Sequence, residues 1–208
     1  MDTEKEVAAY NVSRETFLKL CEFSNILTEW NQKMNLVSKN SISDLWPRHI
    51  LDSLQLIKYM PQNVQTLVDI GSGAGFPGVI LAIALQELQP QAKLYLIESI
   101  HKKTVYLNDV CYRLGLHNVK VINERVENTV FKSVDVITAR AVAALNVLFS
   151  YAHTLGNENT QMLLLKGKTY EQEEAEAQKY WQYSKICYAN AYSDDGVIMQ
   201  ISRLRKRR

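Results

Sequence analysis

Three glycines stand at alternate positions in the segment DIGSGAGFPG, which covers residues 69–78. The apolar, β-branched run before them is typical of a buried strand, and the apolar run after Pro77 is typical of a helix. Gly71, Gly73 and Gly75 let the backbone turn sharply and let a ligand approach where a Cβ would stand in the way. A loop of this kind, after the first strand of an open α/β sheet, indicates a nucleotide-like cofactor.

Three cofactor classes compete for this loop. A Walker-type phosphate loop is disfavoured because no Lys-Ser/Thr pair follows the glycines. The dinucleotide pattern G-x-G-x-x-G is met by Gly73, Gly75 and Gly78, so spacing alone does not exclude it. S-adenosylmethionine (SAM) carries no phosphate. Asp69, just before the glycines, suits a ligand with an amino group and a sulfonium, and would repel a pyrophosphate.

Glu98 closes the second predicted strand. A carboxylate there can accept hydrogen bonds from both ribose hydroxyls, and it disfavours a 2′-phosphorylated cofactor. NAD and SAM both fit this requirement. The chain ends with two predicted strands joined by the turn SDDG (193–196),. A hairpin there adds an antiparallel strand to the sheet, which is typical of a methyltransferase and not of a dinucleotide-binding domain, so the sequence favours SAM.

The elements that must position these residues follow from periodicity. Alternating strands and helices predict a mostly parallel, doubly wound sheet. The predicted strands cover 66–70, 93–98, 118–123, 134–138 and 161–166. Of the predicted helices that connect them, one covers 77–88, a second ends at Gly115 and a third ends at Gly156. A fourth helix begins with YEQEEAEA. Residues 1–62 predict a helical extension, with one helix after the N-cap Ser13 and another from near Ser43 with Pro47 in its first turn. Residues 63–208 are predicted to form the Rossmann-like core, and residues 1–208 are predicted to be a single domain.

Composition narrows the class of protein further. The chain has 208 residues and a formal net charge of +2, which neither demands nor excludes a nucleic-acid partner,. Its three cysteines show no metal-ligand spacing and predict reduced thiols, without a metal site, in a cytoplasmic protein. No apolar run approaches the roughly 20 residues that span a bilayer. Five cations in the last six residues are typical of a disordered, solvated tail,.

Several longer blocks resemble the RsmG (GidB) family of bacterial methyltransferases. They are NLVS (35–38), RHILDSL (48–54), DIGSGAGFPG (69–78), ERVE (124–127), TARA (138–141) and LLKG (164–167). The resemblance implies a class I SAM-dependent methyltransferase fold with an antiparallel C-terminal strand and an N-terminal helical cover. It also implies methyl transfer from SAM to N7 of a guanine, position 527 in the 530 loop of 16S rRNA, in the small ribosomal subunit.

The resemblance also implies roles for single residues. Cofactor contacts fall on Gly71, Gly73, Gly75, Phe76, Glu98 at the ribose, Val126 and Glu127 at the adenine, and Arg140 at the junction of cofactor and substrate. Asp69 is expected to join them because of its own charge and position. Arg140 is the expected catalytic residue, holding guanine O6 or a phosphate while N7 stays free. A different SAM-dependent methyltransferase, an NAD-linked oxidoreductase and a non-catalytic nucleotide-sensing module remain as alternatives.

The chemistry of N7 methylation agrees with the residues present. Guanine N7 offers a lone pair at neutral pH, so positioning matters more than a general base. TARA stands where enzymes that methylate exocyclic amines carry Asn/Asp-Pro-Pro-Tyr, and the cysteines lack the proline neighbours of a C5-pyrimidine methyltransferase. Ribose 2′-O methylation stays open, because Lys166 beside a carboxylate could serve it.

RNA contacts are expected on basic residues around the mouth of the site. The candidates are Arg48, His49, Lys102, Lys103, Arg125 and Lys166; His101 and Lys168 are expected to be solvated charges. Arg48 and Asp52 are four residues apart on a predicted helix and could pair with each other. The protein is expected to act as a monomer.

Overall fold

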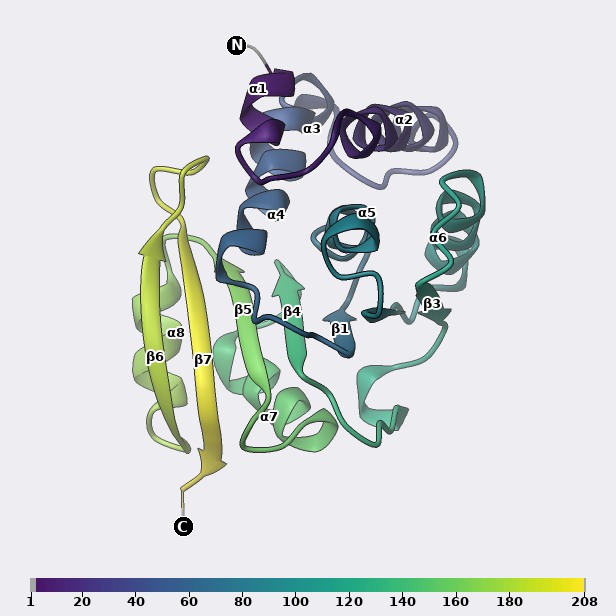
Figure 1. Cartoon of the computed structure of the whole chain (residues 1–208). Coiled ribbons are helices and arrows are strands. Elements are labelled where there is room, and N and C mark those ends of the chain that lie inside the picture. The colour runs from purple at the N-terminus through teal and green to yellow at the C-terminus, as the bar shows by residue number, and fades with distance from the viewer. Residues whose placement is uncertain (1–2, 208) are drawn as a thin grey trace.

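The computed structural model describes residues 3–207, apart from the side chains of residues 39 and 40. Seven strands form one sheet in the order β3-β2-β1-β4-β5-β7-β6 (Figure 1). Their bounds are β1 (Thr66–Ile70), β2 (Lys93–Ile97), β3 (Val119–Ile122), β4 (Val136–Arg140), β5 (Gln161–Lys166), β6 (Trp181–Ala189) and β7 (Val197–Lys206). Strands β1 to β5 pair in parallel, and β7 pairs antiparallel to both β5 and β6. The predicted sheet, with its antiparallel C-terminal strand, is confirmed.

Strand order reverses between β1 and β4. From β1 the chain builds outward through β2 to β3, then returns to add β4 on the other side of β1. Loops that leave β1 and β4 therefore diverge and leave a crevice at the carboxyl edge, where open α/β sheets bind their ligands. The glycine loop follows β1, and Arg140 ends β4.

Helices cover both faces of the sheet (Figure 1). One apolar cluster joins the N-terminal helices to α5 and α6, and a second lies under α7 and α8. The helices are α1 (Thr3–Ala8), α2 (Arg14–Asn31), α3 (Lys39–Ser43), α4 (Asp52–Leu54), α5 (Gly78–Leu88), α6 (His101–Arg113), α7 (Leu145–Leu155) and α8 (Tyr170–Ala177), with 3₁₀ turns η2 (Gln55–Tyr59) and η3 (Val126–Asn128). Because Gly78–Leu85 of α5 are apolar and buried on every side, this helix sits between the sheet and a second layer, which the N-terminal helices supply,.

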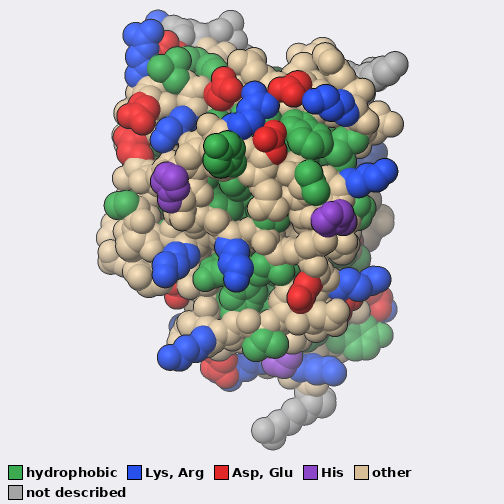
Figure 2. Space-filling view, turned by 90° about the vertical axis from the view of Figure 1, so that its right-hand side faces the viewer, with side chains coloured by type: hydrophobic (Ala, Val, Ile, Leu, Met, Phe, Trp, Pro, Cys, Tyr) green, Lys and Arg blue, Asp and Glu red, His purple; other side chains and the backbone are tan. Residues whose placement is uncertain are grey.

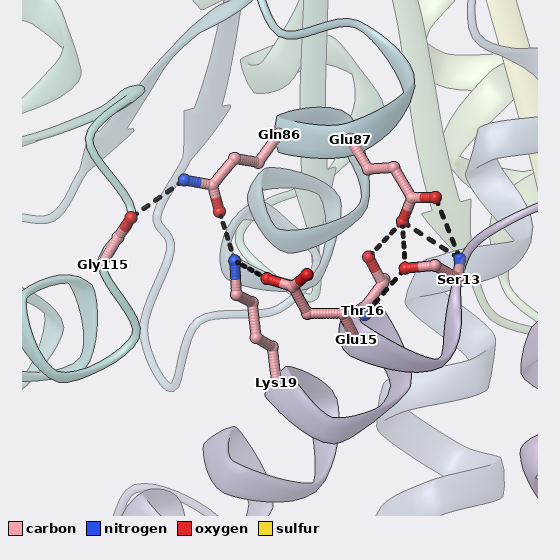
Figure 3. A network of polar contacts seen from close by, with 7 residues as sticks. All are labelled: Ser13, Glu15, Thr16, Lys19, Gln86, Glu87 and Gly115. Carbon is pink, nitrogen blue, oxygen red and sulfur yellow. Dashed lines mark hydrogen bonds and ion pairs between the residues drawn. The ribbon is translucent and has the colours of Figure 1, made fainter.

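Glu87 on α5 anchors the start of α2 (Figure 3). Its carboxylate accepts hydrogen bonds from the backbone N–H of Ser13 at 3.0 Å, from Ser13 Oγ at 2.9 Å and from Thr16 Oγ1 at 2.5 Å. Ser13 Oγ in turn accepts from the backbone N–H of Thr16, so it is the predicted N-cap,. One carboxylate thus satisfies polar groups at the first turn of α2 and fixes that helix on α5.

Two expectations about the chain's local structure need correction. The helix expected from near Ser43 begins as a π-helical turn, η1 (Trp46–Leu51), and continues through α4 into η2, although Pro47 does lie in its first turn. The basic C-terminus is not a disordered tail. It forms β7 up to Lys206, because the ladder with β6 orders the backbone, and Arg205 pairs with Glu158 at 2.5 Å. Arg208 lies outside the described residues.

The side of the molecule formed by α2, α6 and β3 carries positive and negative side chains interspersed (Figure 2). It offers no broad field of one sign to a polyanion. Within residues 3–207, no helix has the length and apolarity needed to cross a membrane. Among the same residues, no three His, Cys, Asp or Glu side chains converge as ligands of a metal ion would.

Candidate active site

Two cavities open at the carboxyl edge of the sheet, on either side of Val142. The smaller, about 130 Å³, lies between Gly71, Glu98 and the loop that follows β3. The larger, about 490 Å³, is lined by Arg140, Lys166 and residues of the N-terminal helices and the β6–β7 turn. Val142 lines both cavities. An elongated ligand could therefore place one end near Glu98 and its other end near Arg140.

The backbone of the glycine loop leaves no room for side chains at three positions, and at one of them, Gly75, a Cβ would lie 2.8 Å from Val79 Cγ2. Gly71 has φ +65°, and a Cβ there would lie 2.7 Å from Val142 Cγ2. A Cβ on Gly78 would lie 2.5 Å from both Asp69 Oδ2 and Leu96 Cδ2, so this glycine lets α5 pack directly on the strands. Gly71 thus presents bare backbone to the smaller cavity, whereas Gly73 and Gly75 line neither cavity,.

Glu98 connects the glycine loop to the smaller cavity. It is 6% exposed, and its carboxylate accepts from the backbone N–H of Gly73 at 3.0 Å and of Ile100 at 2.8 Å. Each carboxylate oxygen can accept a second hydrogen bond. Since Glu98 also lines the cavity, its free acceptor positions suit two ribose hydroxyls. These free acceptor positions on Glu98 and the bare backbone at Gly71 fit the adenosyl part of SAM.

Asp69 and Phe76 lie beneath the loop and line neither cavity. Asp69 is fully buried, and its Oδ1 accepts from Thr138 Oγ1 at 2.7 Å across the β1–β4 pair. Burial raises the pKa of Asp69 to about 6, against opposing hydrogen bonds. Phe76 packs edge-on against Phe23. Both residues support the loop from below in this structure, and direct contact of either with a cofactor stays a prediction.

Arg140 is held by the N-terminal helices. Its Nη2 donates to the backbone carbonyl of Arg48 at 2.7 Å, and its Nη1 lies 3.4 Å from Asp52 Oδ2. Asp52 Oδ1 accepts from Asn190 Nδ2 at 2.6 Å and from Gln55 Nε2 at 3.0 Å. Desolvation lowers the pKa of Arg140 and raises that of Asp52, each partly offset by the other's charge. Asp52 therefore forms its ion pair with Arg140, and not with Arg48 on its own helix as its spacing suggested.

His49 lies against the glycine loop. Its ring stacks on Phe76 with centroids 5.0 Å apart, and its Nε2 is buried without a hydrogen-bond partner. Burial lowers the pKa of His49 to about 4, and the positive charges of Arg140 and Arg48 add to the effect. His49 is therefore neutral at physiological pH, which removes charge attraction as its means of holding RNA.

Lys166 ends β5 at the wall of the larger cavity. Its Nζ lies 2.5 Å from Glu173 Oε2 and donates to the backbone carbonyl of Ala143 at 3.2 Å. The Lys166 side chain is 9% exposed. It is placed at the site, as expected, but its charge is already engaged by Glu173.

Of the remaining predicted residues, Arg48, Arg125, Val126 and Glu127 line one of the two cavities, and Lys102 and Lys103 line neither. Val126 and Glu127 line the smaller cavity, where Glu127 accepts a hydrogen bond from Tyr151 at 3.2 Å. Arg125 lies beside them, 3.9 Å from Glu127. The other basic candidates are on the first turn of α6 and on η1: Lys102 and Arg48 are exposed, and Lys103 is half-buried.

Sequence analysis did not predict four residues that line the larger cavity: Asp52, Val142, Glu173 and Asn190. Val142, Glu173 and Asn190 lie in segments with no chemical motif of their own. The RHILDSL block did contain Asp52, and its spacing from Arg48 suggested a local pair. Only the fold shows that this helix meets the end of β4, and that the β6–β7 turn brings Asn190 beside it.

Comparisons with known proteins agree with this geometry. The family model described as rRNA small subunit methyltransferase G matches residues 17–195. The ribosomal RNA small subunit methyltransferase G of Rickettsia akari is 38% identical over 195 residues, covering 94% of this chain and 98% of the relative. The protein of the same name from Gluconobacter oxydans is 40% identical, covering 94% and 97%.

Solved structures share the fold at low sequence identity. An O-methyltransferase from Bacillus cereus, solved in complex with SAH, has a TM-score of 0.59 and 16% identity, covering 87% of this chain and 90% of that one. A SAM-dependent methyltransferase from Aquifex aeolicus has a TM-score of 0.56 and 16% identity, covering 73% and 89%. The fold is that of class I SAM-dependent methyltransferases, and by sequence this chain belongs to the rRNA small subunit methyltransferase G family, also called GidB.

Proposed function

We propose that this protein transfers a methyl group from SAM to N7 of guanine 527, in the 530 loop of 16S rRNA. Relatives that match nearly the whole chain bear the name ribosomal RNA small subunit methyltransferase G. The observation that carries the proposal is the pair of cavities on either side of Val142. One has the groups that suit an adenosine, and the other has a guanidinium that suits the acceptor edge of a guanine.

The residues at the larger cavity suit a reaction that needs no general base. SAM supplies an electrophilic methyl group on a sulfonium. A nucleophile that already carries a free lone pair needs alignment and exclusion of water, not proton removal. Asp52 pairs with Arg140, and Glu173 pairs with Lys166, so the two carboxylates at this cavity are engaged by cations. Arg140 holds O6 of the guanine or a neighbouring phosphate.

Ribosomal RNA reaches the site across four basic residues. Arg48, Lys102, Lys103 and Arg125 supply the phosphate contacts, and the adenine of the cofactor lies against Val126 and Glu127. The protein works in the cytoplasm, where ribosomal subunits assemble, and acts as a single chain.

The deciding experiment supplies labelled SAM and small ribosomal subunits from cells that lack this protein. We expect the label to enter 16S rRNA at guanine 527. Borohydride reduction followed by aniline should cleave the RNA there, as it does at 7-methylguanosine. Label on a ribose 2′-oxygen, on an exocyclic amine or at another nucleotide would refute the assignment. A binding titration excludes the oxidoreductase alternative if SAH, and not NAD, raises the unfolding temperature.

A further inference from the structure

The loop between β4 and α7 contacts both parts of the site. It covers residues 141–144 and follows Arg140 directly. Its Val142 lies against Gly71 and forms the wall shared by the two cavities. Its Ala141 has φ +52°, a left-handed conformation that costs a residue with a Cβ of order 1 kcal/mol,. A loop with this conformation needs outside contacts to keep it in place.

Lys166 and Glu173 supply those contacts at the far end of the loop. Lys166 Nζ donates to the backbone carbonyl of Ala143 at 3.2 Å. Glu173 Oε2 accepts from the backbone N–H of Leu145, the first residue of α7, at 3.0 Å. The same oxygen lies 2.5 Å from Lys166 Nζ. One ion pair therefore holds a carbonyl of the loop and an otherwise unpaired N–H at the start of α7.

We propose that Lys166 and Glu173 are positioning residues, which fix the 141–144 loop so that Arg140 and Val142 stand correctly for methyl transfer. This inference rests on the proposed function only for its kinetic consequence. It gives Lys166 a role other than the direct RNA contact expected from its charge. With its side chain 9% exposed and its ammonium bound on two sides, Lys166 has little left to offer a phosphate.

A direct RNA contact and a positioning role predict different kinetic effects of replacing Lys166 and of replacing Glu173. If Lys166 attracts RNA by charge, Lys166→Met should raise the KM for RNA, and Glu173→Ala, which removes a negative charge, should lower it. If the pair positions the loop, both substitutions should lower kcat about tenfold, with the KM for RNA changed less than twofold. The double variant should then be no slower than the slower single variant, because the residues act as one unit.

Matched controls separate charge from position. Lys168→Met removes an exposed cation from the same end of β5, and Glu171→Ala removes an exposed carboxylate from the first turn of α8. Neither residue contacts the 141–144 loop through a hydrogen bond found in residues 3–207. Each control therefore reports the effect of charge on the KM for RNA, without loss of kcat.

A second measurement does not depend on activity. Amide hydrogen exchange in residues 141–147 should accelerate in Lys166→Met and in Glu173→Ala, and should stay unchanged in the two controls. Equal exchange in all variants would overturn the positioning role, as would opposite shifts in KM or unchanged kcat in a folded variant. If wild-type protein fails to methylate 16S rRNA while exchange responds as expected, the proposed function fails and the loop contact stands.

Discussion

Arg140 Nη1 lies 3.4 Å from Oδ2 of Asp52, so a strand end of the core and a helix of the N-terminal cover share one buried ion pair. Asp52 is 5% exposed and has two further donors, Asn190 and Gln55. Arg140 Nη1 is buried, and apart from this ion pair it has no hydrogen-bond partner among the described residues. The carboxylate is thus better satisfied than the guanidinium, and the two partners should respond differently to loss of the other.

Removing Asp52 should cost more stability than removing Arg140. Asp52→Ala leaves a poorly hydrated cation and should lower the free energy of unfolding by about 3 kcal/mol. Arg140→Met leaves a carboxyl group whose pKa is already raised by burial and which keeps two amide donors, so its loss should be smaller. Urea denaturation of both single variants and the double variant measures this. Simple additivity of the two losses would contradict a direct interaction.

The same pair allows a functional test. Arg140→Met should lower kcat for rRNA methylation about 100-fold if, as proposed, the guanidinium orients the base or its phosphate. Binding of SAH, measured by calorimetry, should change much less, since the variant leaves the proposed ribose acceptor Glu98 intact. A folded Arg140→Met protein with wild-type turnover would remove Arg140 from the catalytic site.

Glu98→Gln should weaken SAH binding about tenfold, which corresponds to about 1.4 kcal/mol. The carboxylate accepts from Gly73 and Ile100 on different oxygens, so an amide must turn its NH₂ toward one of these N–H groups,. Calorimetric titration with SAH gives the affinity directly. Glu158→Gln is the matched control, because Glu158 is an exposed carboxylate paired with Arg205 and lines neither of the two cavities on either side of Val142. Equal affinities for the two variants would show that Glu98 does not hold the ribose.

Gly71→Ala should destabilise the fold by about 1–3 kcal/mol, through both its left-handed backbone and its clash with Val142,. Adding Val142→Ala should recover the part that arises from the clash and leave the backbone part. Gly167→Ala is the control, since a Cβ there meets nothing within 4 Å. Thermal unfolding of the four proteins separates the two contributions. No recovery in the double variant would mean that Val142 and residue 71 are not in contact.

Much of this architecture could be predicted from local sequence. The bounds of β1 and β5 were predicted as observed, because short apolar runs end at turn residues, and Gly156 does stop α7. Glu98 and Arg140 could be assigned to one site because parallel strands end at the same edge of a sheet. The local pattern gave no sign of the π-helical turn at Trp46–Leu51, since it depends on packing against the core.

Partners distant in the chain could not be predicted. Lys166 and Arg140 both line the larger cavity, but a charge in a sequence does not reveal which carboxylate neutralises it. Val142 is an ordinary apolar residue until the fold brings it against Gly71. The run of C-terminal cations predicts a solvated tail, because a charge pattern carries no information about backbone pairing between strands. In the structure, pairing with β6 orders Arg203 to Lys206 as part of β7.

Lys102 is exposed on the first turn of α6, near the carboxyl edge of β2. Lys102→Met should weaken RNA binding uniformly and flatten the dependence of log K on log salt by about 0.7–0.9, the loss of one phosphate contact. Filter binding over a range of salt concentrations measures the slope. Lys179→Met is the control, because Lys179 follows α8 at the opposite edge of the sheet, beside the start of β6. A slope equal to that of the control would place Lys102 outside the RNA interface.

Lowering the pH should change the free energy of unfolding through two groups, His49 and Asp69, whose effects have opposite signs. The pKa of His49 is lowered to about 4, so between pH 6.5 and 4 the unfolded chain takes up a proton that the folded chain refuses, and stability is lost,. The pKa of Asp69 is raised to about 6, so between pH 6 and 4 the folded chain takes up the proton first, and stability is gained,. In the wild type the two effects partly cancel.

Two variants should separate these effects. Relative to wild type, His49→Phe should gain stability as the pH falls from 6.5 to 4, because it keeps a ring against Phe76 and cannot be protonated. Asp69→Asn should lose stability relative to wild type as the pH falls from 6 to 4, because it lacks the proton uptake of the buried carboxyl group. Urea denaturation at several pH values within this range gives both differences. If the curves of both variants ran parallel to that of the wild type, neither group would have the shifted pKa that its burial implies.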